Sequence, residues 1–307
     1  MNDIYDVIII GAGAAGLTAG IYTSRARLNT LILNEGAVGG QMVLTNEVAN
    51  YPGVETTNGY VLANTMKMQA KSFGCKIKSN VKITSYQLEG TVKEVTLEDG
   101  RSFKGRSVIL APGGRPRSLN IPGEETFKGS GISYCATCDG DFFRDKEIAV
   151  IGGGNSALEE AVTLTNYASK VTIVHQFDRF QAFEHAVEEA KKNPKIEFIM
   201  ESEPRAFSGN WRLQSMTIEH LPTGERKNLK VEGTFIFIGY LPNTEPFKGL
   251  LELNERDEIV VDRDMKTSIS GVFAAGDCIN KKYRQITTAT AEGTIAALSV
   301  SDYLRQM

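Results

Sequence analysis

The stretch DVIIIGAGAAGLTAGIYTSRARLNTLIL, residues 6–33, decides the fold of this chain. It contains the apolar run VIII, which is typical of a buried strand, and then GAGAAG, which has the spacing G-x-G-x-x-G. The segment LTAGIYTSRARL that follows has the periodicity of a helix and leads into a second apolar run. A strand, a glycine turn, a helix and a strand in this order predict the beginning of a dinucleotide-binding fold.

A second stretch, IAVIGGGNSALEEAVTLTNYASKVTIVH at residues 148–175, repeats this order 141 residues further on, counted from Gly11 to Gly152. Another related pair, SVILAPGGRP (107–116) and TFIFIGYLPN (234–243), gives two apolar strands that each end in a glycine–proline turn. This duplication predicts two consecutive folds and not one large sheet. We expect the α/β class, with two Rossmann-like dinucleotide-binding domains of three layers each (ββα).

The second copy is predicted to be inserted into the first. The strand GVFAAGD at residues 271–277 precedes a long helix and has no counterpart near residue 115. The C-terminal segment therefore completes the first domain. We expect a discontinuous FAD-binding domain at residues 1–115 and 245–307, an inserted domain at residues 116–244, and a hinge where the chain crosses between them.

The first glycine turn has the features of a dinucleotide site. Gly11 allows the tight turn, Gly13 lets the backbone approach a pyrophosphate, and Gly16 lets the helix pack closely on the strand. Glu35 lies at the end of the second predicted strand, where its carboxylate can accept the hydroxyls of the adenosine ribose. The alternative is a tight strand–helix turn without a ligand.

Further polar segments favour FAD over NAD at this turn. They are GGQ at residues 39–41, Asn50 before Tyr51, and the pair Gly276–Asp277. Asp277, at a strand end, could accept a ribityl hydroxyl, while the N-terminus of the following helix faces the flavin ring.

The overall composition is that of an ordinary globular protein. Hydrophobic residues make up 41% of the chain and charged residues 23%, and the formal net charge is −3. These values suggest neither nucleic acid nor a membrane surface as a partner. No apolar run approaches the roughly 18 residues of a transmembrane helix. The start, MNDIYDVIII, is interpreted as a buried strand and not as a signal peptide.

The segment SYCATCDGDFF, residues 133–143, carries a C-x-x-C motif. A dithiol at this spacing can form a disulfide, and a lowered pKa makes one thiol a good nucleophile. The alternative, half of a zinc site, needs two more ligands, and the three histidines, His175, His185 and His220, lie far away in the sequence. We therefore expect a redox pair and no metal.

The remaining cysteines, Cys75 and Cys278, are expected to be buried thiols. Cysteines this scattered indicate a reducing cytoplasm and not a disulfide framework. Asp139 follows Cys138 directly and could carry a thiol proton as a general acid or base. Its alternative role is that of a helix N-cap.

The motif C-A-T-C-D-G, with G-A-G-A-A-G before it, G-G-G-N-S-A after it and A-A-G-D…Y-R-Q near the end, resembles the low-molecular-weight thioredoxin reductases over essentially the whole chain. The resemblance implies a homodimer of two-domain subunits with FAD in the discontinuous domain and the dithiol in the inserted one. It also implies that Cys138 faces the flavin C4a, that Cys135 attacks the thioredoxin disulfide, and that Asp139 moves the proton. Domain rotation would present the dithiol to the flavin and to thioredoxin in turn. The implied FAD contacts are Gly11, Gly13, Ala14, Ala15, Gly16, Glu35, Gly40, Gln41, Asn50, Ala111, Gly276, Asp277, Arg284, Gln285 and Ile286.

The family's NADPH site is only half present. Its G-x-G-x-x-A turn is matched by Gly152, Gly154 and Ala157, whereas its H-R-R-x-x-x-R motif is matched only by His175. Gln176, Phe177 and Gln181 stand where the three arginines are expected.

Arginine suits phosphate sites because its planar guanidinium makes bidentate, charge-assisted bonds. At roughly 1.5–3 kcal/mol per bond, losing two or three costs on the order of 5 kcal/mol, or three to four decades of affinity. NADH is no better served, because the position equivalent to Glu35 is Gln176, Asp178 is predicted to lie past the strand end, and Arg179 cannot replace three arginines. The second turn is therefore interpreted as inherited packing without a ligand.

Without a hydride donor, electrons must reach the flavin in another way. The departure resembles the ferredoxin-dependent flavin thioredoxin reductases of anaerobic bacteria and some cyanobacteria, which lack the arginine motif. We expect ferredoxin as the donor, docked on a basic patch for which Lys281 and Lys282 are candidates unless they belong to a solvated loop. The alternatives are an NADPH-dependent thioredoxin reductase with a rebuilt nucleotide site and a non-catalytic redox sensor.

Overall fold

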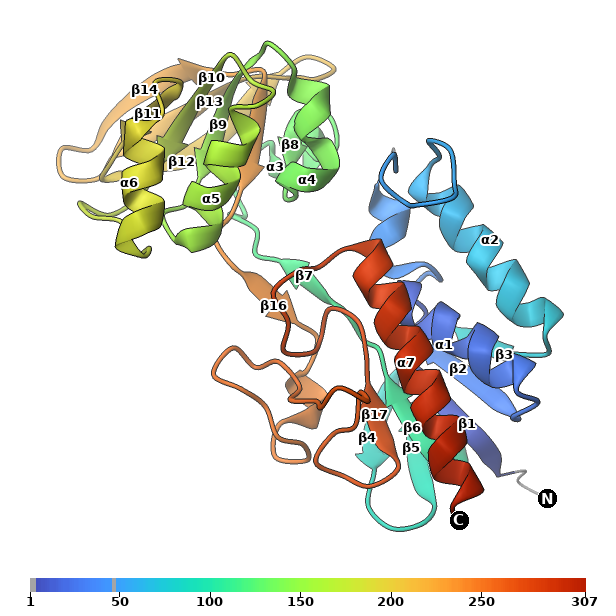
Figure 1. Cartoon of the computed structure of the whole chain (residues 1–307). Coiled ribbons are helices and arrows are strands. Elements are labelled where there is room, and N and C mark those ends of the chain that lie inside the picture. The colour runs from blue at the N-terminus through green and yellow to red at the C-terminus, as the bar shows by residue number, and fades with distance from the viewer. Residues whose placement is uncertain (1–3, 46–47) are drawn as a thin grey trace. The chain divides into compact units, whose positions relative to one another are not determined.

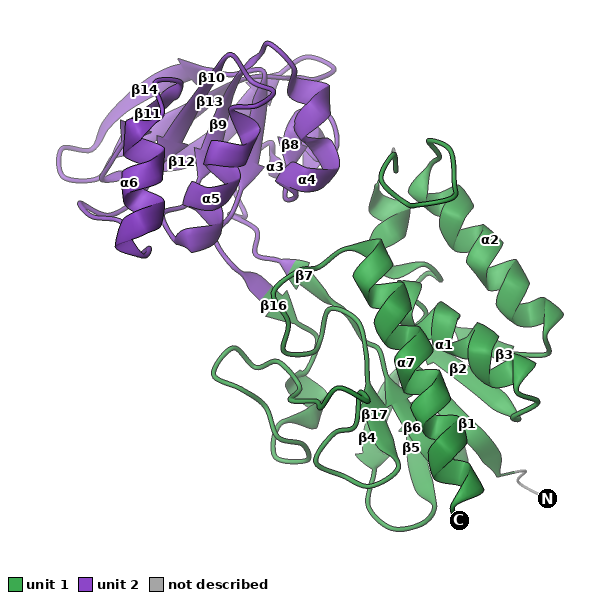
Figure 2. Ribbon diagram, viewed as in Figure 1, with its two compact units in different colours: residues 1–115, 241–307 green, residues 116–240 purple. Residues whose placement is uncertain are grey.

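The computed structural model describes residues 4–45 and 48–307 (Figure 1). The chain divides into two compact units: unit 1 comprises residues 1–115 and 241–307, and unit 2 comprises residues 116–240 (Figure 2). Unit 2 thus ends at residue 240, whereas the sequence led us to expect residue 244. The reason is that β7 (Gly114–Pro116) pairs with β16 (Tyr240–Pro242), so that the chain changes unit within these paired strands.

Unit 1 is built on a sheet whose parallel part has the order β3-β2-β1-β6-β17. Apart from β7 and β16, the elements of unit 1 are β1 (Tyr5–Ile10), α1 (Ala14–Arg25), β2 (Thr30–Asn34), the 3-10 helix η1 (Gly40–Leu44), α2 (Gly59–Ser72), β3 (Lys76–Ser79), β4 (Ile83–Gln87), β5 (Lys93–Leu97), β6 (Ser102–Leu110), η3 (Glu245–Phe247), β17 (Val272–Ala274) and α7 (Ile286–Arg305). The long strand β6 is the branch point of this single sheet: its first half pairs antiparallel with β5, and its second half pairs parallel with β17.

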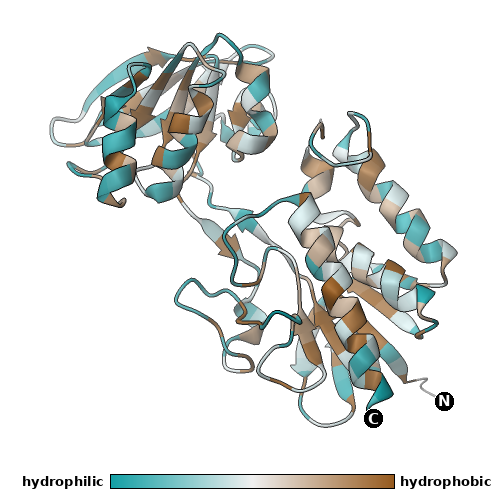
Figure 3. Ribbon diagram, viewed as in Figure 1, coloured by the Kyte–Doolittle hydropathy of each residue, from teal (hydrophilic) through white to brown (hydrophobic). Residues whose placement is uncertain are grey.

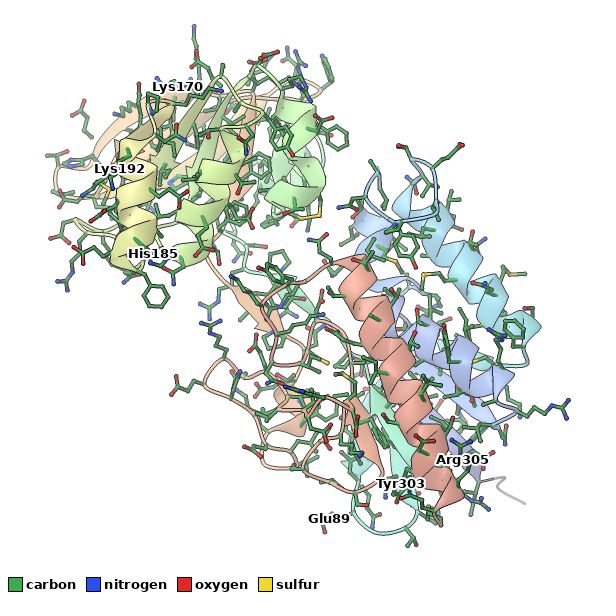
Figure 4. The ribbon with its side chains drawn as sticks, in the orientation of Figure 1. Glu89, Lys170, His185, Lys192, Tyr303 and Arg305 are labelled. Atoms are coloured by element: carbon green, nitrogen blue, oxygen red, sulfur yellow. A yellow bond between two sulfur atoms is a disulfide. The ribbon has the colours of Figure 1, made fainter. Side chains whose placement is uncertain are left out.

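The core of unit 1 lies between the parallel strands and their covering layers. Residues 7–10 of β1 are all buried, as expected for a parallel strand that is covered on both faces. Helices α1 and α7 lie side by side (Figure 1). Their close approach requires Gly293, because a Cβ there would lie 2.3 Å from the carbonyl oxygen of Ala15. Near its C-terminus, α7 places Tyr303, labelled in Figure 4, against Phe273 of β17 at 6.1 Å between ring centroids.

Unit 2 has a parallel sheet of order β11-β10-β9-β15-β8 and a separate antiparallel sheet of order β12-β13-β14. Its elements are α3 (Glu124–Phe127), β8 (Ile132–Ser133), α4 (Ala136–Asp139), η2 (Gly140–Phe143), β9 (Glu147–Ile151), α5 (Asn155–Leu164), β10 (Lys170–Val174), α6 (Glu184–Lys192), β11 (Ile196–Ile199), β12 (Ser202–Gly209), β13 (Leu213–His220), β14 (Glu225–Lys230) and β15 (Gly233–Ile236).

The side chains of β9 point alternately to the two faces of the parallel sheet, toward the helices on one face and toward the antiparallel sheet on the other. Ile148 and Val150 pack in one cluster with residues of α5 and α6, while Ala149 and Ile151 pack in another with residues of β12 and β13. The strands at the centre of each unit are correspondingly apolar (Figure 3). The prediction of an α/β fold with two Rossmann-like domains is confirmed.

Among the residues that the structure describes, no helix is both long and apolar enough to cross a membrane.

Candidate active site

The C-x-x-C motif begins at Cys135, the N-cap residue of the short helix α4, and ends at Cys138 within that helix. Cys135 and Cys138 are joined in a disulfide with their Cα atoms 5.3 Å apart, and both residues are partly exposed. The backbone N–H of Cys138 donates to Cys135 Sγ at 3.2 Å. The disulfide confirms the redox interpretation, whereas the half-zinc interpretation does not match a pair whose sulfurs are bonded to each other.

The carboxylate of Asp139 is held from the preceding strand. Asp139 Oδ2 accepts the hydroxyl of Ser133 at 2.6 Å. Burial raises the pKa of Asp139, and the hydrogen bond from Ser133 lowers it in part. Asp139 does stand at the N-cap position of η2, but its side chain makes no capping hydrogen bond there and accepts from Ser133 instead.

Buried polar groups anchor the segment before the dithiol. Glu124 accepts the backbone N–H groups of Leu119 and Asn120 at 3.0 and 2.7 Å and the hydroxyl of Tyr134 at 2.7 Å. Tyr134 is thereby fixed beside Cys135, and its burial raises the pKa of its hydroxyl. Sequence reasoning missed this support, for which the only local signal was a set of polar residues flanking C-x-x-C.

The other two cysteines belong to unit 1. Cys75 and Cys278 are free and buried, as expected, and burial raises the pKa of Cys75 to about 11 and that of Cys278 to about 12. Neither thiol is therefore suited to act as a nucleophile near neutral pH.

The first glycine turn is shaped by close backbone contacts. A Cβ at Gly11 would lie 2.1 Å from the carbonyl oxygen of Ala111, and one at Gly16 would lie 2.0 Å from the carbonyl oxygen of Gly11. Gly13 differs: among the described residues, no atom lies within 4 Å of its Cβ position. It precedes Ala14 and Ala15, the first residues of α1, and supplies no capping side chain. The helix N-terminus thus has room and N–H donors for an anionic group.

The segment after β2 packs on this turn. The buried side chain of Asn34 accepts the backbone N–H of Ala12 at 2.9 Å, and the N–H of Gly39 donates to the carbonyl oxygen of Ala12 at 2.8 Å. A Cβ at Gly40 would lie 3.2 Å from Gly13 Cα. Asn34 was missed by sequence reasoning, although a polar residue that ends the buried strand LILN was a usable signal.

Two exposed side chains flank this segment. Gln41 belongs to η1, next to Gly40, and is exposed. Glu35 directly follows β2 and is also exposed, and its Oε1 accepts the backbone N–H of Ile83 at 3.1 Å. Glu35 thus lies at the end of β2, as the sequence predicts.

Segments distant in the sequence complete the site in unit 1. A Cβ at Gly276 would lie 2.9 Å from Ala15 Cβ, so the Gly276–Asp277 turn lies against the beginning of α1. Asn50 donates to Gln285, the N-cap residue of α7, at 3.5 Å, and Ile286 begins that helix. Gly40 and Gly276 thus lie against the first turn and the beginning of α1, and the space at Gly13 has room for a pyrophosphate such as that of FAD.

The side chain of Lys281 is enclosed within unit 1, between Asp277 and Glu292, and is not available on a docking surface. Its side chain is 10% exposed, and its Nζ lies 2.8 Å from Glu292 Oε2 and 3.0 Å from Asp277 Oδ1. Glu292 Oε2 also accepts the backbone N–H of Gly276 at 3.0 Å. The expectation that Lys281 contributes to docking is wrong, because two carboxylates hold its charge within unit 1, whereas Lys282 is exposed.

The predicted contact Arg284 is also anchored by a carboxylate. It forms an ion pair with Glu258, which is buried and accepts a further bond from Asn254 at 2.7 Å.

Two glycines of the second turn, Gly152 and Gly153, pack closely against other parts of unit 2. A Cβ at Gly152, where φ is +137°, would lie 2.4 Å from the carbonyl oxygen of Phe237, and one at Gly153 would lie 2.4 Å from the His175 ring. His175 is buried, stacks on Phe180, and its Nε2 lies 3.1 Å from the carbonyl oxygen of Arg179. These contacts require glycine for steric reasons, with or without a ligand.

The residues that replace the expected arginines are all exposed: Gln176, Phe177 and Gln181. The backbone N–H of Gln181 donates to the carbonyl oxygen of Gly153 at 2.8 Å, which places this loop beside the second turn. The surface at this turn therefore presents amide and aromatic groups at the positions of the family's guanidinium groups.

Comparison with known proteins supports the resemblance. The family model "Pyridine nucleotide-disulphide oxidoreductase" matches residues 5–293. The chain is 44% identical over 306 residues to the thioredoxin reductase of Bacillus subtilis (strain 168), which covers 99% of this chain and 96% of that protein. It is 43% identical over 311 residues to the thioredoxin reductase of Peptoclostridium acidaminophilum, with 99% and 98% covered. The crystal structure of thioredoxin reductase from Streptococcus pyogenes MGAS5005 matches with a TM-score of 0.95, 40% identity and 100% of both chains covered. The chain therefore belongs to the low-molecular-weight thioredoxin reductase family of pyridine nucleotide-disulphide oxidoreductases.

Proposed function

We propose that this chain is a flavin-dependent thioredoxin reductase that receives electrons from reduced ferredoxin and delivers them to thioredoxin through Cys135 and Cys138. The disulfide and the adjoining carboxylate of Asp139 support the thioredoxin half of the proposal. The observation that carries the ferredoxin half is the loop after β10, which lacks the arginines of an NADPH site. In keeping with the resemblance, the enzyme works as a homodimer.

FAD would be held in unit 1. The N-terminus of α1 after Gly13 would hold the pyrophosphate, Glu35 the adenosine ribose, and Asp277 the ribityl chain. When bound, FAD supplies a two-electron store that can be filled one electron at a time, which matches a one-electron donor.

The reduced dithiol performs the exchange with thioredoxin. The Cys135 thiolate attacks one sulfur of the thioredoxin disulfide, forming a mixed disulfide and releasing the other thioredoxin sulfur as a thiolate. The Cys138 thiolate then attacks Cys135 Sγ, which re-forms the enzyme disulfide and releases the second thioredoxin sulfur. The two protons of the enzyme dithiol end on thioredoxin, and Asp139 carries a proton between the sulfurs.

The contact from the Cys138 backbone supports this division of labour. An N–H group that donates to sulfur stabilises the thiolate over the thiol. In the oxidised pair seen here the donor points to Cys135 Sγ, and the same contact in the reduced pair would favour a thiolate at Cys135, the residue that we propose attacks thioredoxin.

One observation favours the NADPH-dependent alternative. At Gly154, the N-cap residue of α5, the nearest atom to a built Cβ is the carbonyl oxygen of Gln181 at 4.0 Å, so the helix N-terminus is not filled. A pyrophosphate could therefore approach there. Without the arginines, however, such binding lacks its 2′-phosphate contacts, and we retain ferredoxin as the donor.

The donor is tested by anaerobic mixing of the oxidised, flavin-loaded protein with reduced ferredoxin, NADPH or NADH, with flavin bleaching as the readout. We expect rapid bleaching by ferredoxin only. Rapid bleaching by micromolar NADPH would refute the donor assignment. Steady-state reduction of thioredoxin distinguishes the enzyme from a redox sensor.

A variant with restored arginines makes this test sharper. The triple substitution Gln176→Arg, Phe177→Arg and Gln181→Arg adds three exposed guanidinium groups beside the second turn. We expect NADPH to bind about three to four decades more tightly than in the wild type. NADH is the matched control, because it lacks the 2′-phosphate and should gain little.

A further inference from the structure

The hydroxyl of Ser133 links the acidic group of the site to the residue that carries the attacking sulfur. It donates to Asp139 Oδ2 at 2.6 Å and accepts the backbone N–H of Cys135 at 3.1 Å. Ser133 is buried, with 4% of its surface exposed, so solvent competes little for these bonds.

A second acceptor lies within reach of the same hydroxyl, namely the carbonyl oxygen of Cys135 at 3.3 Å. A serine hydroxyl has one hydrogen and two lone pairs, so it donates one bond at a time. When Asp139 is charged, the hydrogen points to the carboxylate. When Asp139 is protonated, its own O–H donates to Ser133 Oγ, and the serine hydrogen turns to the Cys135 carbonyl. Each protonation state of Asp139 therefore keeps its hydrogen bonds.

We propose that Ser133 is a positioning residue for the dithiol reaction, whose hydroxyl holds Asp139 beside the Cys135–Cys138 pair through both protonation states and sets the pH at which Asp139 exchanges its proton. The proposal rests on the proton-carrying role of Asp139 in the proposed function. Without the hydroxyl, Asp139 would lose its anchor and a donor that favours its charged form.

The titratable side chains next to Asp139 in the fold have partners of their own. In the oxidised protein, burial raises the pKa of Asp139 and the hydrogen bond from Ser133 lowers it. The Tyr134 hydroxyl is bound to Glu124 at 2.7 Å, and the Tyr167 ring lies against Gly140.

Two further acidic groups lie on the neighbouring elements. Asp141 of η2 forms an exposed ion pair with Arg144 at 2.5 Å. On α5, burial raises the pKa of Glu160.

The first test is a direct titration of Asp139 in the oxidised, flavin-loaded protein. Its carboxyl stretching band is identified in infrared difference spectra by its absence in Asp139→Asn. In Ser133→Ala we expect the titration to move upward by about one pH unit, because a donor to the charged form is lost. Ser133→Thr keeps the hydroxyl and should titrate as the wild type does. Thr137→Ala, which removes an exposed hydroxyl from the same turn, is the matched control.

The second test measures thioredoxin reduction by protein that has been chemically reduced beforehand, over a range of pH. Ser133→Ala should shift the Asp139-dependent limb of the profile in the same direction, and it should cause no further loss in the Asp139→Asn background. An unmoved infrared titration, or an equal loss of rate in that background, overturns the proposal. If Ser133→Ala does not fold, Ser133→Gly replaces it. The infrared titration requires neither ferredoxin nor thioredoxin, so its result is independent of whether the proposed function holds.

Discussion

Substitution of alanine at two glycines of the first turn should separate folding from cofactor binding. At Gly16 the added Cβ would lie 2.0 Å from the carbonyl oxygen of Gly11, more than 1 Å inside an ordinary contact, and the obstructing atom belongs to the backbone. Overpacking of this kind typically lowers the unfolding free energy by about 1–3 kcal/mol. Because the backbone at Gly11 cannot move aside easily, Gly16→Ala should cost about 3 kcal/mol. At roughly 2–4 °C per kcal/mol for a unit of this size, the unfolding midpoint should fall by about 6–12 °C.

Gly13→Ala should behave in the opposite way. Its backbone has an ordinary φ of −78°, and among the described residues no atom would meet the Cβ within 4 Å. The flavin-free protein should therefore unfold within about 2 °C of the wild type. FAD affinity should fall by about 10- to 100-fold, because the methyl group displaces the pyrophosphate from one charge-assisted N–H bond.

The assay is thermal unfolding of the flavin-free variants together with a titration of FAD followed by flavin fluorescence. Gly154→Ala, at the corresponding position of the second turn, is the matched control and should change neither quantity. Wild-type FAD affinity in Gly13→Ala would refute the placement of the pyrophosphate. A loss of stability in Gly13→Ala as large as that in Gly16→Ala would refute the steric reasoning.

Three further outcomes are expected. Lys281→Met leaves the carboxylates of Asp277 and Glu292 without their cation and should cost about 3 kcal/mol in unfolding free energy, whereas Lys282→Met should have little effect; calorimetry of both variants checks this. Asp139→Asn should slow thioredoxin reduction. It should also raise the unfolding midpoint at pH 7 but not near pH 4, because a pKa raised by burial means that the folded state loses stability as pH rises through that pKa. Cys138→Ser should keep flavin reduction by ferredoxin and lose thioredoxin turnover, and turnover that persists would contradict the electron path.

Local steric rules explain which parts of the fold were predictable. Gly11 and Gly16 contact atoms in their own strand–turn–helix unit and in the adjoining Ala111, so the pattern of small and apolar residues carried the information. The disulfide of Cys135 and Cys138 was likewise a matter of short spacing. The end of unit 2 was misplaced because β7 and β16 pair across a long sequence separation, which no local pattern records.

The site shows the same division. Lys281 and Lys282 are equivalent as neighbouring letters, yet one is enclosed by two carboxylates and the other is exposed. Asp139 stands at the N-cap position of η2, yet its carboxylate bonds Ser133 and not the backbone of that helix. In both cases the partner of a charged side chain depends on how the chain packs around it.

The sequence by itself determined the two glycine turns, the redox pair and the replacement of three expected arginines, since each depends on residue type at a short, regular spacing. Only the tertiary structure decided which polar groups face one another: Ser133 with Asp139, Lys281 with Glu292, and Asn34 with Ala12. The physical reason is that a buried polar group must find a hydrogen-bonding partner wherever the packed chain brings one within reach, and that partner need not be near in the sequence.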